Sequence, residues 1–144
     1  MRSRIAVAAT LVVILLGAPG CYFRKYEKLA RTHADILVAM TAKLEDVTAR
    51  DGTPPGSLVE YRYPLERAED FADIAARRFD DRASLRALRA LCAAYGRLLD
   101  AADRTRASMI GGSPPPSPTL AATADEVRAA AATVTRELDR EHAG

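Results

Sequence analysis

The chain has 144 residues, of which 49% are hydrophobic and 28% charged, with 21 basic against 19 acidic side chains. This length and composition fit a single globular domain with a modest core. A net charge of only +2 argues against the strongly basic face of a nucleic-acid-binding protein, so we expect no nucleic-acid partner.

The first 21 residues carry the pattern of a bacterial secretion signal. Arg2 and Arg4 precede the uncharged segment 5–16, whose twelve residues have the length of a signal-peptide core and are too few to span a bilayer comfortably. The segment 18–21 then reads Ala-Pro-Gly-Cys and ends at Cys21. This tetrapeptide resembles the lipobox of bacterial lipoproteins.

The resemblance implies how the chain is processed and where it resides. In that family the cysteine thiol receives a diacylglycerol, the chain is cut before the cysteine, and the new amino group is usually acylated. Residues 1–20 would thus be a cleaved signal peptide, and residues 21–144 a domain anchored through acyl groups on Cys21. Tyr22 is not the aspartate that retains some lipoproteins in the inner membrane, which implies an outer-membrane protein facing the periplasm.

The lipid anchor leaves the second cysteine without a disulfide partner. The mature chain would hold 19 basic and 19 acidic residues, because two arginines are removed with the signal. Cys92 lies on the apolar stripe of a predicted helix, where a lone cysteine usually behaves as a small hydrophobic residue. We therefore expect Cys92 in the core.

A long first helix is predicted from Tyr22 to Ala49. Two rows of residues recur at seven-residue spacing, and two further apolar residues lie beside them. These positions are Tyr26, His33, Met40 and Val47 in one row, Ala30, Leu37 and Leu44 in the other, with Leu29 and Ile36 alongside. Such a stripe is typical of a helix that packs lengthwise in a bundle. The Pro- and Gly-rich segment 50–56 ends this helix.

The segment 57–63 (SLVEYRY) is predicted to be a structured loop, because a single strand would have nothing to pair with. Pro64 suits the first turn of a second helix, which should end near Asp80 and Asp81. Its apolar stripe consists of Leu65, Ala68, Phe71, Ala72, Ala75 and Phe79.

The third helix has the clearest periodicity. Its stripe at spacings of three and four consists of Leu85, Leu88, Cys92, Tyr95, Leu99, Ala102 and Met109, widened by Leu91 and Leu98. Asp81 or Ser84 is predicted to cap its start, and Gly111 and Gly112 to end it. A single rod made of the second and third helices is the alternative, because an acidic pair is a weak helix break.

The segment 111–119 (GGSPPPSPT) is predicted to be a linker. A fourth helix should then begin near Pro118 or at Thr123, where Thr123 and Glu126 match a capping box. Its stripe is Val127, Ala130, Ala131, Val134 and Leu138. The sequence therefore predicts an all-α protein, an antiparallel bundle of three to four helices after a cleaved signal peptide.

His33 and Met40 are the residues that suggest a cofactor. They lie seven residues apart on one helix, about 10 Å along its axis, so they cannot both ligate one iron. His142 is close to residue 144 and is expected to fray. The chain has no paired Glu-x-x-His motifs for a di-iron centre and no nucleophile, phosphate-binding or dinucleotide motif. We expect no cofactor, no metal and no enzymatic activity.

Two features favour an interaction role. Tyr61, Arg62 and Tyr63 form a predicted loop cluster of the type enriched at protein interfaces, although the rings could instead close one end of the bundle. A basic run follows the anchor and would either contact anionic headgroups or form the polar face of the first helix. That run is Arg24, Lys25, Lys28 and Arg31.

These observations favour a membrane-anchored, non-catalytic envelope lipoprotein. It would act as an interaction or assembly accessory that docks to, steadies or escorts an envelope protein complex. The alternative is a four-helix bundle that binds a small molecule or a haem-like cofactor around His33, Met40 and Tyr95. A third possibility is self-assembly through the heptad stripes into a coiled-coil oligomer.

Overall fold

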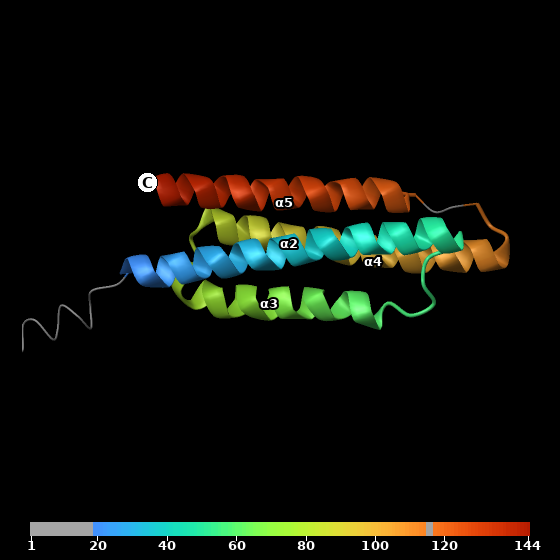
Figure 1. Ribbon diagram of the computed structural model, residues 1–144, viewed down its shortest axis with the longest axis horizontal. Coiled ribbons are helices and arrows are strands. Elements are labelled where there is room, and N and C mark those ends of the chain that lie inside the picture. The colour runs from blue at the N-terminus through green and yellow to red at the C-terminus, as the bar shows by residue number, and fades with distance from the viewer. Residues whose placement is uncertain (1–18, 115–116) are drawn as a thin grey trace, which may run out of the picture.

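The computed structural model describes residues 19–114 and 117–144. Four helices account for most of this part of the chain: α2 (Pro19–Asp51), α3 (Val59–Phe79), α4 (Ala83–Gly111) and α5 (Leu120–Ala143). Their directions alternate, so α2 and α4 run one way and α3 and α5 the other (Figure 1). The predicted all-α antiparallel bundle is confirmed, and the predicted signal-peptide segment 5–16 lies outside the described residues.

The bundle has two distinct ends. The start of α2, the α3–α4 turn and the end of α5 lie together at one end, which we call the Cys21 end (Figure 1). The α2–α3 loop and the α4–α5 connection lie at the other, which we call the distal end. Within the described residues, the buried apolar core extends from Tyr26 to Leu138.

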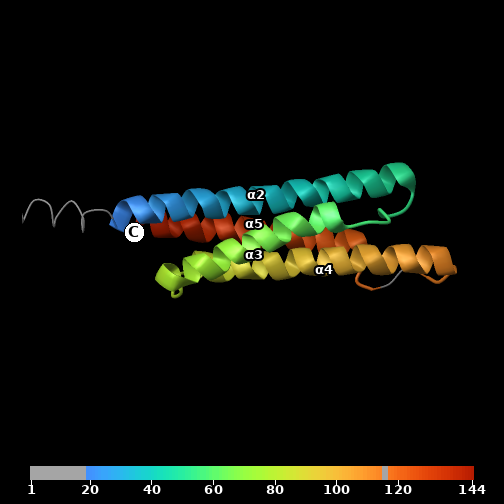
Figure 2. The same cartoon turned by 90° about the horizontal axis from the view of Figure 1, so that it is seen from below.

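Helix α4 is the centre of the packing. It packs most extensively against α5 and also against α3, while α2 contacts all three other helices (Figure 2). The predicted stripe of α4 is buried from Leu85 to Ala102, as are Leu91 and Leu98. Met109 lies beyond the core and is exposed, because α4 extends past α3 at the distal end.

The core face of α2 differs in part from the predicted one. Of the two predicted rows, the one through Leu37 is fully buried, whereas the row through His33 is only half-buried beyond Tyr26. Ala34 and Thr41 complete the core face, and the Thr41 hydroxyl donates to the carbonyl of Leu37 (2.8 Å). Leu29 and Ile36 were predicted on this stripe but are exposed.

The start of α3 contradicts the predicted loop over 57–63. The helix begins at Val59, and the carbonyl of Leu58 accepts hydrogen bonds from the amides of both Tyr61 and Arg62. Pro64 therefore lies in the second turn, where its missing N–H leaves one carbonyl of the first turn unpaired. The Tyr95 hydroxyl donates to the neighbouring carbonyl of Tyr61 (2.8 Å), which steadies this interrupted turn.

Helices α3 and α4 are separate, as the acidic pair at 80–81 predicted. The N-cap of α4 is Arg82, which makes no side-chain cap, so neither Asp81 nor Ser84 has the predicted capping role. The acceptor for the first turn instead comes from α5, where Glu141 Oε1 accepts from the Ser84 amide (3.1 Å). A distant carboxylate thus replaces a local cap.

Two glycines and one arginine shape the distal end. Gly52 and Gly112 have φ values of +73° and +68°, the left-handed conformation in which a helix commonly stops. Arg106 interrupts the apolar stripe of α4 because its guanidinium donates to the carbonyl of Pro54 (2.6 Å) in the α2–α3 loop.

Helix α5 begins between the two predicted starts. Its N-cap is Thr119, whose hydroxyl accepts from the amide of Ala122 (3.2 Å). The predicted capping box is wrong, because Thr123 is buried and its hydroxyl donates back to the carbonyl of Leu120 (2.8 Å). The predicted stripe is confirmed, with Val134 and Leu138 fully buried.

Candidate functional site

Cys21 lies in the first turn of α2 and is exposed. At about 100° per residue, it lies roughly 180° around the helix axis from Ala30 and 160° from Leu37, both of which are in the core. The thiol therefore stands on the outer face of α2. Gly20 belongs to the same first turn, whereas Ala18 lies outside the described residues.

The predicted basic run divides into two groups. Arg31 is bound on two sides, since its Nη2 lies 3.0 Å from Glu27 Oε1 and 2.7 Å from Asp139 Oδ1. Arg24, Lys25 and Lys28 are exposed and form no ion pair within residues 19–114 and 117–144. Of the four residues of the run, these three therefore have no acidic partner in the described chain.

A cluster of aromatic rings fills the Cys21 end between α2 and α3. Tyr26 stacks on Phe71 with centroids 6.0 Å apart and lies 4.6 Å from Phe79. Phe23 completes the cluster, 6.0 Å from Tyr26. The heptad pattern indicated Tyr26, but the gathering of the other rings depends on how α3 returns alongside α2.

A buried polar network joins three helices at this end. The hydroxyls of Tyr26 and Ser84 lie 2.7 Å apart, and the Ser84 hydroxyl donates to Glu141 Oε2 (2.6 Å). Burial raises the pKa of Tyr26, outweighing the lowering effect of the bond to Ser84. The network satisfies polar groups that would otherwise be costly to bury.

A second polar group lies beside it between α2 and α5. His142 was expected to fray, but it is part of α5 and its Nδ1 lies 3.0 Å from Glu27 Oε2. Burial acts to raise the pKa of Glu27, but the bonds from Arg31 and His142 outweigh it and lower that pKa. These contacts hold the last turns of α5 against α2.

The predicted interaction residues all lie in the first turns of α3, but they differ in exposure. Tyr61 is 3% exposed and part of the core, whereas Tyr63 is 62% exposed. Arg62 lies at the surface, with Nη2 2.9 Å from Asp103 Oδ2 of α4. Val59 is also exposed one turn earlier, so Arg62, Tyr63 and Val59 form the accessible surface at the distal start of α3.

The predicted cofactor residues are not arranged around one point. His33 stacks on Phe71 with centroids 4.9 Å apart, at the half-buried margin of α2 and α3. Burial, and after it the charge of Arg67, lowers the pKa of His33. Met40 is two turns further along α2 and packs against the core.

Cys92 is a core residue, as predicted, with 4% of its surface exposed. Burial, and after it the charge of Glu69, raises the pKa of its thiol to about 12. A thiol with such a pKa carries almost no thiolate at neutral pH and is a poor nucleophile.

No group of three or more metal-ligating side chains lies close enough to hold an ion within residues 19–114 and 117–144. Among the helices of the described chain, none combines the length and apolar character that crossing a membrane requires. No family model, curated protein or solved structure matches the chain.

Proposed function

We propose that this protein is a lipid-anchored, non-catalytic accessory of the bacterial cell envelope. It faces the periplasm from the outer membrane, and its helical bundle binds a partner protein. The proposal is carried by the position of Cys21, which is exposed on the outer face of α2 at one end of the bundle. An acyl group on this thiol would leave the packing of the core unchanged.

The groups with the most strongly raised pKa values support a structural role for the interior. Burial raises the pKa of both Cys92 and Tyr95. In active sites such shifts belong to groups that face a cleft and meet substrate. Here Tyr95 is fully buried and donates to a backbone carbonyl. Cys92 borders a hollow between α3 and α4 but is only 4% exposed, and its raised pKa keeps the thiol protonated.

The distal start of α3 supports a protein partner. Tyr63 and Val59 are 62% and 74% exposed, and Arg62 lies between them. Exposed tyrosine and arginine side chains are enriched at protein interfaces. Because α3 has 21 residues, its start lies about 30 Å along the bundle from the Cys21 end, away from the anchor.

The anchor is tested by replacing the lipidated thiol. Cys21→Ala should release the protein from membranes or leave it as unprocessed precursor, and it should abolish incorporation of labelled palmitate. Cys92→Ala is the matched control, because it removes the other thiol and should leave both properties intact. A Cys21→Ala protein that is processed and still bound to the membrane would contradict the anchor.

The partner is tested by crosslinking in the native membranes, followed by affinity capture and mass spectrometry. One recurrent partner is expected, and the double variant Arg62→Ala with Tyr63→Ala should capture less of it. Arg136→Ala is the control, because the Arg136 side chain is exposed like that of Arg62 but lies on α5, outside the start of α3. Equal capture by both variants would remove the partner surface from the start of α3.

A further inference from the structure

An apolar hollow of about 260 Å³ lies between α2 and α3 at the Cys21 end. Its floor is the aromatic cluster of Tyr26, Phe71 and Phe79. Tyr22, Leu29 and Ile74 line it while being 55%, 36% and 63% exposed. Apolar side chains gathered in this way on a surface mark a site of interaction.

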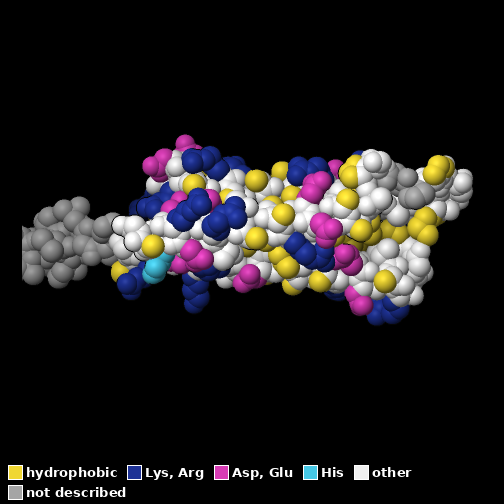
Figure 3. Space-filling model, turned by 90° about the horizontal axis from the view of Figure 1, so that it is seen from above, with side chains coloured by type: hydrophobic (Ala, Val, Ile, Leu, Met, Phe, Trp, Pro, Cys, Tyr) yellow, Lys and Arg dark blue, Asp and Glu magenta, His cyan; other side chains and the backbone are white. Residues whose placement is uncertain are grey.

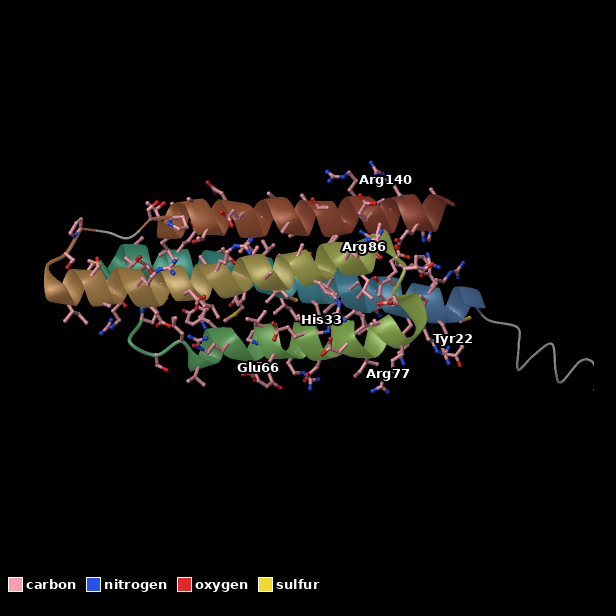
Figure 4. All side chains as sticks on the ribbon, turned by 180° about the vertical axis from the view of Figure 1, so that it is seen from behind. Tyr22, His33, Glu66, Arg77, Arg86 and Arg140 are labelled. Atoms are coloured by element: carbon pink, nitrogen blue, oxygen red, sulfur yellow. The ribbon has the colours of Figure 1, made fainter. Side chains whose placement is uncertain are left out.

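Cations surround this hollow. Lys25, Arg77 and Arg78 line its rim, and none of them forms an ion pair with any residue of the described chain. The guanidinium of Arg78 lies over the Tyr22 ring, 4.3 Å from its centroid. Figure 4 shows Tyr22 and Arg77 at the end where α2 begins, with Glu66 farther along α3. The α2–α3 patch is defined as Tyr22, Lys25, Leu29, Ile74, Arg77 and Arg78.

The patch belongs to a wider asymmetry of charge along the bundle. The segments 21–31, 74–86 and 134–144 at the Cys21 end hold ten basic and six acidic residues, whereas the rest of residues 21–144 holds nine and thirteen. The face covered by α5 mixes both signs (Figure 3). Excess positive charge therefore collects at the Cys21 end, although residues 21–144 as a whole are neutral.

The anchor and the patch share one side of α2. Lys28 and Lys25 lie about 20° and 40° from Cys21 around the helix axis. The patch residues Leu29 and Tyr22 lie farther round in the direction of Lys25, at about 80° and 100°. Acyl chains on Cys21 would thus leave α2 on the side that carries these cations and borders the hollow. The acidic side chains of Asp70 and Asp73 line the next hollow along α3 and mark where the patch ends.

We propose that the α2–α3 patch binds the surface of an anionic phospholipid bilayer, so that the bundle leans onto the membrane instead of standing on its acyl chains alone. This inference rests on the proposed lipid anchor. Lysine and arginine side chains bind headgroup phosphates, while apolar side chains enter the boundary between headgroups and acyl chains. The basic rim of the patch therefore matches the headgroup phosphates, and its apolar hollow matches the boundary between headgroups and acyl chains.

The test places a fluorophore on the patch of the full-length, natively processed protein. Ile74→Cys and, as a control, Val59→Cys are each labelled with the environment-sensitive dye NBD. Val59 is 74% exposed on the same helix at the distal end. Both proteins are reconstituted into phosphatidylcholine vesicles with or without phosphatidylglycerol, each containing spin-labelled lipid as a quencher.

With phosphatidylglycerol, we expect the label at residue 74 to shift to shorter wavelength and to be quenched, and high salt should reverse both effects. The label at residue 59 should remain unquenched. Equal behaviour of the two labels would overturn the proposal and is the result expected if the patch instead binds a protein. Equal quenching with and without phosphatidylglycerol would overturn the anionic preference.

Charge variants test the basic rim. Each lysine or arginine near an anionic surface contributes about fivefold to binding, so Arg77→Gln with Arg78→Gln should weaken patch binding about 25-fold. Arg50→Gln with Arg104→Gln removes the same charge from the distal end and should have no effect. Equal effects of the two pairs would refute a role for the rim.

The same samples separate this inference from the proposed anchor. An unlipidated Cys21 would take up the dye, which intact mass detects, whereas the buried Cys92 would not. Dye on Cys21 would refute the anchor, and an unquenched label at residue 74 beside a lipidated Cys21 would refute the patch alone.

Discussion

Replacing Glu141 should destabilise the bundle far more than replacing any other carboxylate of α5. Its side chain accepts hydrogen bonds from both the amide and the hydroxyl of Ser84, at 3.1 and 2.6 Å. An acid near a helix C-terminus is unfavourable to that helix, so Glu141 costs α5 some stability. Its benefit goes to α4, whose first turn has no side-chain cap of its own.

The magnitude follows from the bonds that are lost. Loss of a helix cap costs about 1 kcal/mol. Loss of a hydrogen bond to a charged acceptor costs about 1.5 kcal/mol or more, partly offset because the Ser84 hydroxyl keeps Tyr26. Glu141→Ala should therefore lower the free energy of unfolding by about 2–3 kcal/mol. In a domain of this size the melting temperature would fall by roughly 8–12 °C.

Glu137→Ala is the matched control. Glu137 is also on α5 and its side chain is 17% exposed against 14% for Glu141. Within the described chain, its carboxylate forms ion pairs with Arg136 and Arg140 of its own helix and with no other helix. Such local pairs contribute about 0.5 kcal/mol. Urea unfolding of residues 21–144, followed by circular dichroism, measures both variants. Equal losses, or a Glu141→Ala protein as stable as the wild type, would refute the assignment of Glu141 as the cap of α4.

Three other predictions concern buried side chains. Because burial raises the pKa of its thiol to about 12, Cys92 should resist iodoacetamide until urea unfolds the protein. An unlipidated Cys21, which is exposed, should react at once. Mass spectrometry of the folded protein should find no adduct on Cys92. Burial and Arg67 should hold the pKa of His33 below 6.5 in an NMR titration. The stability this depressed pKa confers is complete above 6.5 and lost as pH falls through the folded value, so His33→Gln should unfold less readily in acid. Tyr95→Phe removes a hydroxyl bonded to a carbonyl of α3 and should cost about 1 kcal/mol in urea unfolding. No change in stability would contradict that bond.

The apolar pattern predicted best those helices whose buried face can be identified from the spacing of apolar residues in the local sequence. The stripe from Leu85 to Ala102 is buried as expected, because α4 is central and meets a neighbour on most of its surface. The first turn of α3 was missed because Pro64 favours a helix start and because Val59, Tyr61 and Tyr63 alternate like a strand. Packing of Tyr61 into the core overrides both signals.

The polar contacts of the Cys21 end could not be found in the same way. Ser84 and Glu141 are 57 residues apart, and Glu27 and His142 are 115 apart. Each of these four residues has the local sequence of an ordinary surface residue. Many other polar residues of the chain could serve equally well as its partner, and only the arrangement of the helices shows which one does. The basic run was visible, but only the structure shows that Arg31 is bound to acids and that Arg77 of α3 joins the cations of α2.

The alternating directions of four helices bring residue 144 back beside the start of α2 (Figure 1). If Cys21 carries the proposed lipid anchor, a protein or tag joined after residue 144 would lie next to the membrane and compete with it for space. The chain passes from α4 to α5 at the distal end of the bundle, about 50 Å from the start of α2, which is the length of that helix. With the proposed anchor in place, a reporter inserted there would therefore be more accessible than one fused at residue 144.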